Sequence, residues 1–376
     1  MEPILVNRIL FILGNIFLGT GFLYFVFIYI RLALFLFHKK KVNQHLSSPH
    51  PISILMIVHN EENRIERILS ELLNQKYSKY EVVVVDDFSE DRTSFILSYL
   101  SEKYSNLHFT SINQNIYFSD KQSVNLALKA AKYEWVVFVS PDTDYIPPTF
   151  LEEINNEITD SSSYYINYSN YLPKKGNYNR ICRMERFFSF INSATYSAFN
   201  ISFFTQRNNV LFAKKKYFDT KPFRGKMNRY DVDIELLFNC KWGGRRILFN
   251  KYSGATPLRE NGSLSKDDFY ELFRKKRILR KDCSFFQKLF MRSGTFSFLL
   301  MLFSFTVILF LKPEIWYYEL IPFVFLFFMN IAKIEIFKKR LKEIEIVLPS
   351  IVYLFIRPLV LFYYNFLSFF YYRHNR

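Results

Sequence analysis

Four short runs of apolar and β-branched residues alternate with three amphipathic stretches between residues 52 and 140, and this alternation limits the fold more than any other feature. The apolar runs span residues 52–58, 81–86, 107–112 and 135–140, and the stretches between them span residues 63–75, 91–104 and 121–132. Continuous apolar runs are typical of strands buried on both faces, and apolar residues at helical spacing are typical of helices that cover such strands. The alternation predicts an α/β domain with a parallel sheet covered on both faces. After Phe150 the alternation loosens, with a helix expected over residues 181–199 and a strand over 209–212.

Long apolar segments lie on both sides of this region. Residues 9–30 are almost uncharged, and a bilayer takes about 20 such residues to cross. They are followed by Lys39, Lys40 and Lys41. Lysine and arginine bias the flanks of transmembrane segments to the cytoplasm, so this stretch reads as a retained anchor whose C-terminal end is cytoplasmic.

The C-terminal part carries two more apolar runs, residues 295–311 and 316–332, followed by basic residues at positions 338, 339, 340 and 342. These runs predict a transmembrane hairpin with both ends in the cytoplasm. A last apolar segment, residues 346–372, is interrupted at Pro349 and at Arg357-Pro358. It either spans the membrane or lies at or dips into the interface, and its basic end favours the interface.

These patterns divide the chain into an anchor (residues 1–38), a soluble domain (50–290) and a C-terminal membrane region (294–372). They predict a multi-pass protein of the cell inner (plasma) membrane with a cytoplasmic soluble domain. The chain has 50 basic and 34 acidic residues, a net charge of +16. Such a surplus suits an anionic membrane face or a phosphate-bearing substrate. No nucleic-acid-binding module is recognisable, so no nucleic-acid partner is expected. Three cysteines without a CxxC pair argue against a zinc site or a disulfide framework.

Polar clusters follow three of the predicted strands. The first strand ends in "VHNEE", the second in "DDFSED", and the fourth is followed by Asp142 and Asp144. The carboxyl ends of parallel strands meet at one sheet edge, where open α/β sheets bind ligands. Acidic side chains gathered there repel one another unless a cation compensates, and Mg²⁺ or Mn²⁺ suits such oxygen ligands. A turn is the alternative reading of Asp142 and Asp144, because Asp and Pro are common turn residues.

The stretch "ISILMIVHNEENRIERILSELLNQKYSKYEVVVVDDFSEDRT" resembles the opening of the inverting family 2 glycosyltransferases, which have the GT-A fold. "KQSVNLALKAAKYEWVVFVSPDTD", "NNVLFAKKKYF", "YDVDIELL" and the basic "RKKRILR" follow in the order of that family. The resemblance covers about residues 50 to 280 and implies a Rossmann-like nucleotide-diphospho-sugar transferase domain. The apolar flanks resemble the membrane-anchored members that build cell-surface polysaccharides and glycolipids.

The resemblance also implies roles for individual residues. Nucleotide-sugar binding falls to His59, Glu61, Asp87, Lys121, Asn125 and Asp142. Asp142 and Asp144 match the DxD pair, which meets the ribose and the metal that bridges the diphosphate. Asp231 matches the general base. The implied reaction is transfer of a hexosyl or N-acetylhexosaminyl group, from a donor expected to be UDP-linked, to a lipid-linked or saccharide acceptor, with Mg²⁺ or Mn²⁺.

The sequence departs from the family pattern at three places. The DxD segment reads Val139-Ser140-Pro141-Asp142-Thr143-Asp144, so either Asp142 or Asp144 is the metal ligand. Tyr230 stands where a Glu usually precedes the base, which makes Asp233 a second candidate. Of the usual Gln-x-x-Arg-Trp only Arg277 is kept, and "RKKRILR" can also form a cationic collar on lipid head groups. The alternative to an enzyme is therefore a non-catalytic, glycosyltransferase-like membrane scaffold.

Overall fold

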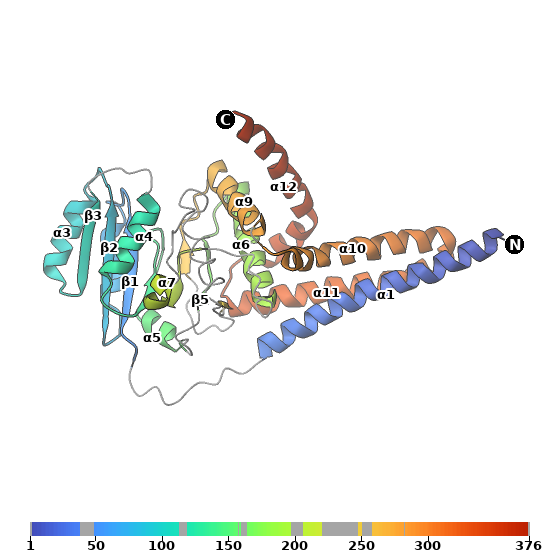
Figure 1. Cartoon of the computed structure of the whole chain (residues 1–376), viewed down its shortest axis with the longest axis horizontal. Helices are drawn as coiled ribbons and strands as arrows, with labels where there is room; N and C mark the ends of the chain where they lie inside the picture. The colour runs from blue at the N-terminus through green and yellow to red at the C-terminus, as the bar shows by residue number, and fades with distance from the viewer. Residues whose placement is uncertain are drawn as a thin grey trace. The chain divides into compact units, whose positions relative to one another are not determined.

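The computed structural model describes residues 2–37, 49–112, 119–156, 158, 164–196, 206–219, 247–249, 258–281 and 283–374 (Figure 1). The chain forms two compact units. One comprises residues 1–39 and 280–339, and the other comprises residues 40–279 and 340–376. Each unit is described by itself below.

A seven-stranded sheet forms the centre of the larger unit, with strand order β3-β2-β1-β4-β7-β5-β8. Its first four strands in this order are parallel: β1 (Ile52–Val58), β2 (Tyr80–Asp87), β3 (Leu107–Ile112) and β4 (Trp135–Phe138). All four strands predicted between residues 52 and 140 are present. β7 (Val210–Ala213) runs antiparallel to β4 and to β5 (Tyr164–Ile166), and β5 pairs in parallel with β8 (Ile247–Phe249). The sheet is thus mixed beyond its parallel half.

Helices between the parallel strands supply the connections that such strands need. These are α2 (Ile65–Leu73), α3 (Thr93–Lys103) and α4 (Ser119–Ala130), and Figure 1 shows α3 and α4 beside the strands. The five apolar residues of α2 recur at helical spacing, and all are buried: Ile65, Ile68, Leu69, Leu72 and Leu73. They pack against alternate residues of β1 and β2 in one hydrophobic core. The α/β architecture expected from the alternation is confirmed.

The second half of the unit is built from shorter elements. Two of its helices are α5 (Phe150–Asn155) and α7 (Lys214–Asp219). A two-stranded sheet pairs β6 (Ser169–Tyr171) in parallel with β9 (Leu258–Glu260). Two longer helices follow these strands in the chain: α6 (Asn177–Tyr196) comes after β6, and α9 (Lys266–Lys281) comes after β9. The helix expected over residues 181–199 begins four residues earlier than predicted.

Among the described residues, three helices are long and apolar enough to cross a membrane. They are α1 (Glu2–Phe37), α10 (Phe285–Leu311) and α11 (Trp316–Arg340), the last preceded by a 3-10 turn, η2 (Pro313–Ile315). α1 packs on α10 through small residues. A Cβ atom at Gly21 would lie 2.5 Å from Cγ of Met301, and one at Gly14 would lie 3.1 Å from Cγ1 of Ile308. Small residues allow such close helix packing in membranes.

The last apolar segment forms one helix, α12 (Val347–His374), and it belongs to the larger unit. The expected interruptions at Pro349 and at Arg357-Pro358 are wrong, because the helix continues past both positions. Pro349 lies in the first turn, where the missing N–H has no helical partner to lose. Only residues 347–357 of α12 form a shorter apolar segment, and α12 is not one of the three candidate spans found among the described residues.

Candidate functional site

The three polar clusters after the strands lie together at one edge of the sheet. β1 pairs with β2 so that Val58 is opposite Asp86, and with β4 so that Leu55 is opposite Phe138. Several contacts join the loops that carry these clusters. Nδ1 of His59 lies 2.7 Å from the carbonyl oxygen of Asp87, and Arg64 forms an ion pair with Asp142. The convergence expected from strand direction is therefore present.

The loops after β1 and β2 hold each other in place. Asn60 and Phe88, just beyond the strand ends, have φ angles of 55° and 57°. Residues other than glycine rarely adopt this left-handed conformation, although Asn tolerates it best. Asn60 donates its backbone N–H to Oγ of Ser89 at 2.9 Å, and its side-chain oxygen accepts the N–H of Glu90 at 2.8 Å. These cross-loop bonds position His59 and Asp87 on a fixed backbone.

Arg64 links the first cluster to the DxD segment. It stands just before α2 and pairs with Glu61 at 2.7 Å as well as with Asp142. Glu61 is buried, and this burial raises the pKa of its carboxyl group, while the Arg64 guanidinium opposes part of the rise. The Asp142 side chain is 46% exposed, so its pair with Arg64 is reachable from solvent.

The backbone of the DxD segment is held from two sides. Arg67 of α2 donates to the carbonyl oxygens of Thr143, at 3.1 Å, and Asp144. On the other side, the Asp144 N–H donates to the carbonyl oxygen of Arg259 at 2.7 Å, and the Asn261 N–H donates to that of Asp142 at 2.9 Å. The segment is rigid without any help from its two carboxylates.

This geometry bears on the turn interpretation of Asp142 and Asp144. An Asp that builds a turn accepts a nearby backbone N–H with its carboxylate. Among the described residues, neither carboxylate accepts a backbone N–H, and the one contact of the Asp142 carboxylate is its ion pair with Arg64. The exposed Asp144 carboxylate is therefore available to a ligand, and the half-exposed Asp142 carboxylate becomes available when a ligand displaces Arg64.

A cavity of about 240 Å³ lies beside the DxD segment. Its walls come from the end of β4, from the loop before β7, and from α6 and α9. Its polar lining residues are Ser140, Tyr171, Arg186, Gln206, Arg207, Asn208, Glu260, Asp268, Glu271 and Lys275. Open α/β sheets bind ligands in crevices at the carboxyl ends of their strands, so the position of this cavity makes it a candidate substrate pocket.

Glu260 organises one wall of this cavity. Its carboxylate accepts from Asn208 at 2.9 Å and from Ser169 at 3.0 Å, and it pairs with Arg186 at 2.9 Å. The Arg186 guanidinium also lies 3.8 Å from the ring centre of Tyr171, a favourable cation–π distance. Four residues of these sites were not predicted from the sequence: Arg64, Arg186, Asn208 and Glu260. Arg64 alone had a local signal, as a cation at the start of the helix that follows the first polar cluster.

The remaining predicted site residues differ in burial and in their position relative to the cavity. Lys121 is buried and Asn125 half-buried, both on α4, which packs on β2 and β1. Arg277 is exposed on α9 and does not line the cavity, whereas Lys275, two residues earlier, does. Asp231 and Asp233 lie outside the described residues.

Asp142 and Asp144 are the carboxylates that could hold a divalent cation at this edge of the sheet. Among the described residues, no three His, Cys, Asp or Glu side chains gather at one point. Two carboxylates fit Mg²⁺ or Mn²⁺ where the other ligands are water and substrate phosphate, as is usual for Mg²⁺. Asp142 and Asp144 fit a metal that binds together with a diphosphate.

A parallel sheet with polar clusters at its strand ends, extended by an antiparallel strand, defines the GT-A type of nucleotide-diphospho-sugar transferase fold. A mannosyltransferase from Pyrobaculum calidifontis, solved with GDP-Man and Mn²⁺, shares this fold. It is 14% identical, the alignment covers 92% of this chain and 98% of that one, and the TM-score is 0.50. Residues 53–231 match the family described as Glycosyl transferase family 2, and the chain contains a domain of this family.

Curated relatives match a shorter stretch. The poly-beta-1,6-N-acetyl-D-glucosamine synthase of Staphylococcus aureus is 29% identical over 125 residues, which is 33% of this chain and 29% of that protein. An uncharacterized glycosyltransferase of Haemophilus influenzae is 28% identical over 120 residues, 30% of this chain and 36% of that one. The chain thus matches about a third of the length of each of these relatives.

Proposed function

We propose that this protein is a membrane-bound inverting glycosyltransferase that transfers a sugar from a nucleotide-sugar to a lipid-linked or saccharide acceptor in cell-surface glycan biosynthesis. The observation that carries the proposal is the pair of accessible carboxylates, Asp142 and Asp144. They stand on a rigid segment where three strand ends meet, and a cavity adjoins them. The family 2 domain supports the same reaction class.

The nucleotide is proposed to bind over the ends of β1 and β2. His59, Glu61 and Asp87 face it from the two interlocked loops, and Lys121 and Asn125 belong to the same site. A UDP-linked N-acetylhexosamine or hexose is the proposed donor. The name of the Staphylococcus aureus relative, a synthase of an N-acetylglucosamine polymer, supports the N-acetylhexosamine.

Sugar transfer requires that the departing diphosphate be stabilised while the acceptor hydroxyl loses its proton. Mg²⁺ or Mn²⁺ held by Asp142 and Asp144 would offset the charge that grows on the diphosphate. Asp231 is the proposed general base, and Asp233 the second candidate. A single base on the face opposite the leaving group gives direct displacement with inversion.

The acceptor is proposed to enter the cavity between the DxD segment and α9. Hydrogen-bonding and charged side chains line it, among them Arg186, Asn208 and Glu260, and these suit sugar hydroxyls. The three apolar helices support a membrane location. Basic residues at 39–41 and 338–342 support a cytoplasmic catalytic domain in the plasma membrane, by the positive-inside rule.

Replacement of Asp142 or Asp144 by Asn tests this proposal. Either change should weaken metal-dependent binding of a UDP-sugar by tenfold or more, because one charged ligand to the cation is lost. Calorimetric titration of UDP-N-acetylglucosamine and UDP-glucose with and without Mn²⁺ measures the effect, and transfer assays accompany it. Glu102→Gln, an exposed carboxyl-to-amide change on α3, is the matched control. If both Asn variants bind donor and metal as the wild-type protein does, Asp142 and Asp144 are only turn residues. Donor binding without turnover in the wild-type protein would support the scaffold alternative.

Arg64→Gln should tighten the binding of Mn²⁺ measured without nucleotide. In the wild-type protein the cation competes with Arg64 for Asp142. A partly exposed ion pair is worth up to about 1 kcal/mol, which corresponds to about a fivefold change in affinity. Titration of Mn²⁺ followed by its electron paramagnetic resonance (EPR) signal measures this directly. Arg67→Gln is the control, because Arg67 holds backbone carbonyls of the same segment. An unchanged or weaker affinity in Arg64→Gln would contradict the competition.

A further inference from the structure

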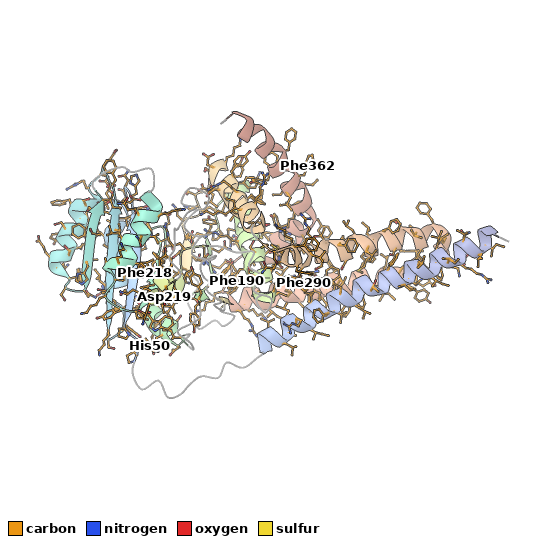
Figure 2. All side chains as sticks on the ribbon, in the orientation of Figure 1. His50, Phe190, Phe218, Asp219, Phe290 and Phe362 are labelled. Carbon is orange, nitrogen blue, oxygen red and sulfur yellow. The ribbon has the colours of Figure 1, made fainter. Side chains whose placement is uncertain are left out.

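One face of α12 is a continuous stripe of large apolar side chains exposed to solvent. The six residues that form this stripe are 50% to 72% exposed and recur every three or four positions: Leu348, Val352, Phe355, Leu359, Phe362 and Phe366. Figure 2 labels one of them, Phe362. Ile356 and Tyr363, 39% and 45% exposed, widen the stripe on one side. An apolar surface of this extent marks an interaction site rather than an ordinary water-facing surface.

The opposite face of α12 is anchored to α6 and α9 within the larger unit. Arg357 makes two hydrogen bonds to the carboxylate of Glu185, at 3.0 and 3.1 Å, and Tyr353 donates to it at 2.5 Å. Lys276 of α9 contacts the same carboxylate at 2.5 Å. Near the C-terminal half, the ring of Tyr364 stacks on Phe273 of α9, with ring centres 5.2 Å apart.

The loop before α12 has a second anchor. Glu343 is buried and pairs with Arg183 of α6 at 3.1 Å. It also accepts hydrogen bonds from Tyr168 at 2.6 Å and from Asn170 at 2.8 Å. Two buried carboxylates, Glu185 and Glu343, thus hold the segment after residue 340 against the same helix. The orientation of α12 on the larger unit is set by charge pairs as well as by packing.

These anchors exclude a membrane-spanning α12. With 28 residues the helix is about 42 Å long, enough to cross a bilayer. Arg357 lies near its middle, however, and is bonded to Glu185, which also pairs with Lys276. If α12 spanned, these charged residues of α6 and α9 would enter the hydrocarbon core with it, where charged groups are costly. Only a helix that lies along the membrane surface keeps its charged contacts within the protein and places its apolar stripe in lipid.

The chemistry of the stripe favours lipid over a second copy of the chain. A coiled-coil seam is narrower and is flanked by charged residues that set the pairing. α12 contains no Asp or Glu, and four of the eight exposed side chains are aromatic. Aromatic side chains on an apolar helix face favour the interface of a bilayer. The same chain supplies three helices able to cross a membrane, so a bilayer is close by.

We propose that α12 lies in the plane of the membrane, with its stripe at the boundary of head groups and acyl chains, and docks the glycosyltransferase domain on the lipid surface. α9 lines the cavity through Glu271 and Lys275 and packs on α12 through Phe273. Docking through α12 therefore keeps the wall of the cavity next to lipid. This inference concerns a binding surface and stands apart from the proposed transfer reaction.

Depth measurements on the full-length protein in vesicles test the proposal. Single spin labels are placed at Leu348→Cys, Phe355→Cys and Phe362→Cys after replacement of the native cysteines. The vesicles contain phosphatidylcholine and phosphatidylglycerol, and EPR accessibility to oxygen and to a water-soluble nickel chelate gives the depth of each label. All three labels should be protected from nickel at one shallow depth, about 5–10 Å below the head groups. Phe95→Cys is the matched control, because Phe95 is an equally exposed phenylalanine, on α3, and should be open to nickel.

Three outcomes would overturn the proposal. Positions 348 and 362 lie about 21 Å apart along a helix, so depths that differ by that order would show a spanning helix. Nickel access at all three positions would show a water-facing stripe. Line broadening between labels on different molecules, together with nickel access in diluted samples, would show a contact between copies. None of these readouts depends on sugar transfer, so failure here leaves the proposed function standing, and loss of activity leaves this proposal standing.

Discussion

Asp231→Asn is expected to lower the rate of sugar transfer by about 10²–10⁴-fold, the usual contribution of a general base. Asparagine cannot accept the proton of the acceptor hydroxyl. Donor affinity should stay near the wild-type value, because the proposed donor contacts lie elsewhere, at His59, Asp87 and Asp142. Steady-state transfer with a UDP-sugar and calorimetric donor binding measure the two quantities side by side.

The competing role for Asp231 is structural. It stands before the apolar pattern of residues 234–238, where an Asp can cap a helix. Asparagine caps nearly as well as Asp, so the melting temperature should not change under either role, and only the rate separates them. Asp233→Asn is the neighbouring control and should be milder. An active Asp231→Asn with an inactive Asp233→Asn would move the base to Asp233, and two active variants would remove this segment from the mechanism.

Glu185→Gln is expected to destabilise the protein by about 3 kcal/mol or more. Glu185 is fully buried and pairs with two cations, Arg357 and the buried Lys276. Removal of one partner from a buried charge cluster leaves an uncompensated charge and costs about 3–5 kcal/mol. Thermal unfolding of the full-length protein in detergent measures the loss.

The matched control is Glu271→Gln on α9. Glu271 pairs with Arg274 at 2.7 Å, but its side chain is 44% exposed. An exposed pair contributes under about 1 kcal/mol, so this variant should melt close to the wild-type protein. Equal effects of the two changes would show that burial of the Glu185 cluster does not matter.

The effect of Glu185→Gln should also depend on pH. Burial raises the pKa of Glu185, but Arg357 and Lys276 outweigh it, so the pKa lies well below its ordinary value of 4.5. A carboxyl group with a lowered pKa stabilises the folded state above its unfolded pKa, and this contribution is lost as the pH falls toward the folded value. The difference between wild type and Glu185→Gln should therefore be full above about pH 4.5 and shrink below it.

The sequence alone determined the parallel half of the sheet and the edge at which the polar clusters meet. The run from Ile52 to Val58 and the helical spacing of Ile65, Ile68 and Leu72 are local patterns. An element buried on one or both faces shows a characteristic spacing of apolar residues along the sequence. The meeting of His59, Asp87 and Asp142 also followed from sequence, because parallel strands end at a common edge.

Only the tertiary structure decided the partners of these residues. Arg64 pairs with Asp142 from 78 positions away, and the backbone of Arg259 holds Asp144 from 115 positions away. The spacing of residues within one segment does not predict such contacts, because they depend on how separate elements pack. The same holds for α12. Its composition permits both a spanning and an interfacial helix, and the interfacial placement that we propose rests on Glu185, a buried charge 172 positions from Arg357 that would be costly in hydrocarbon.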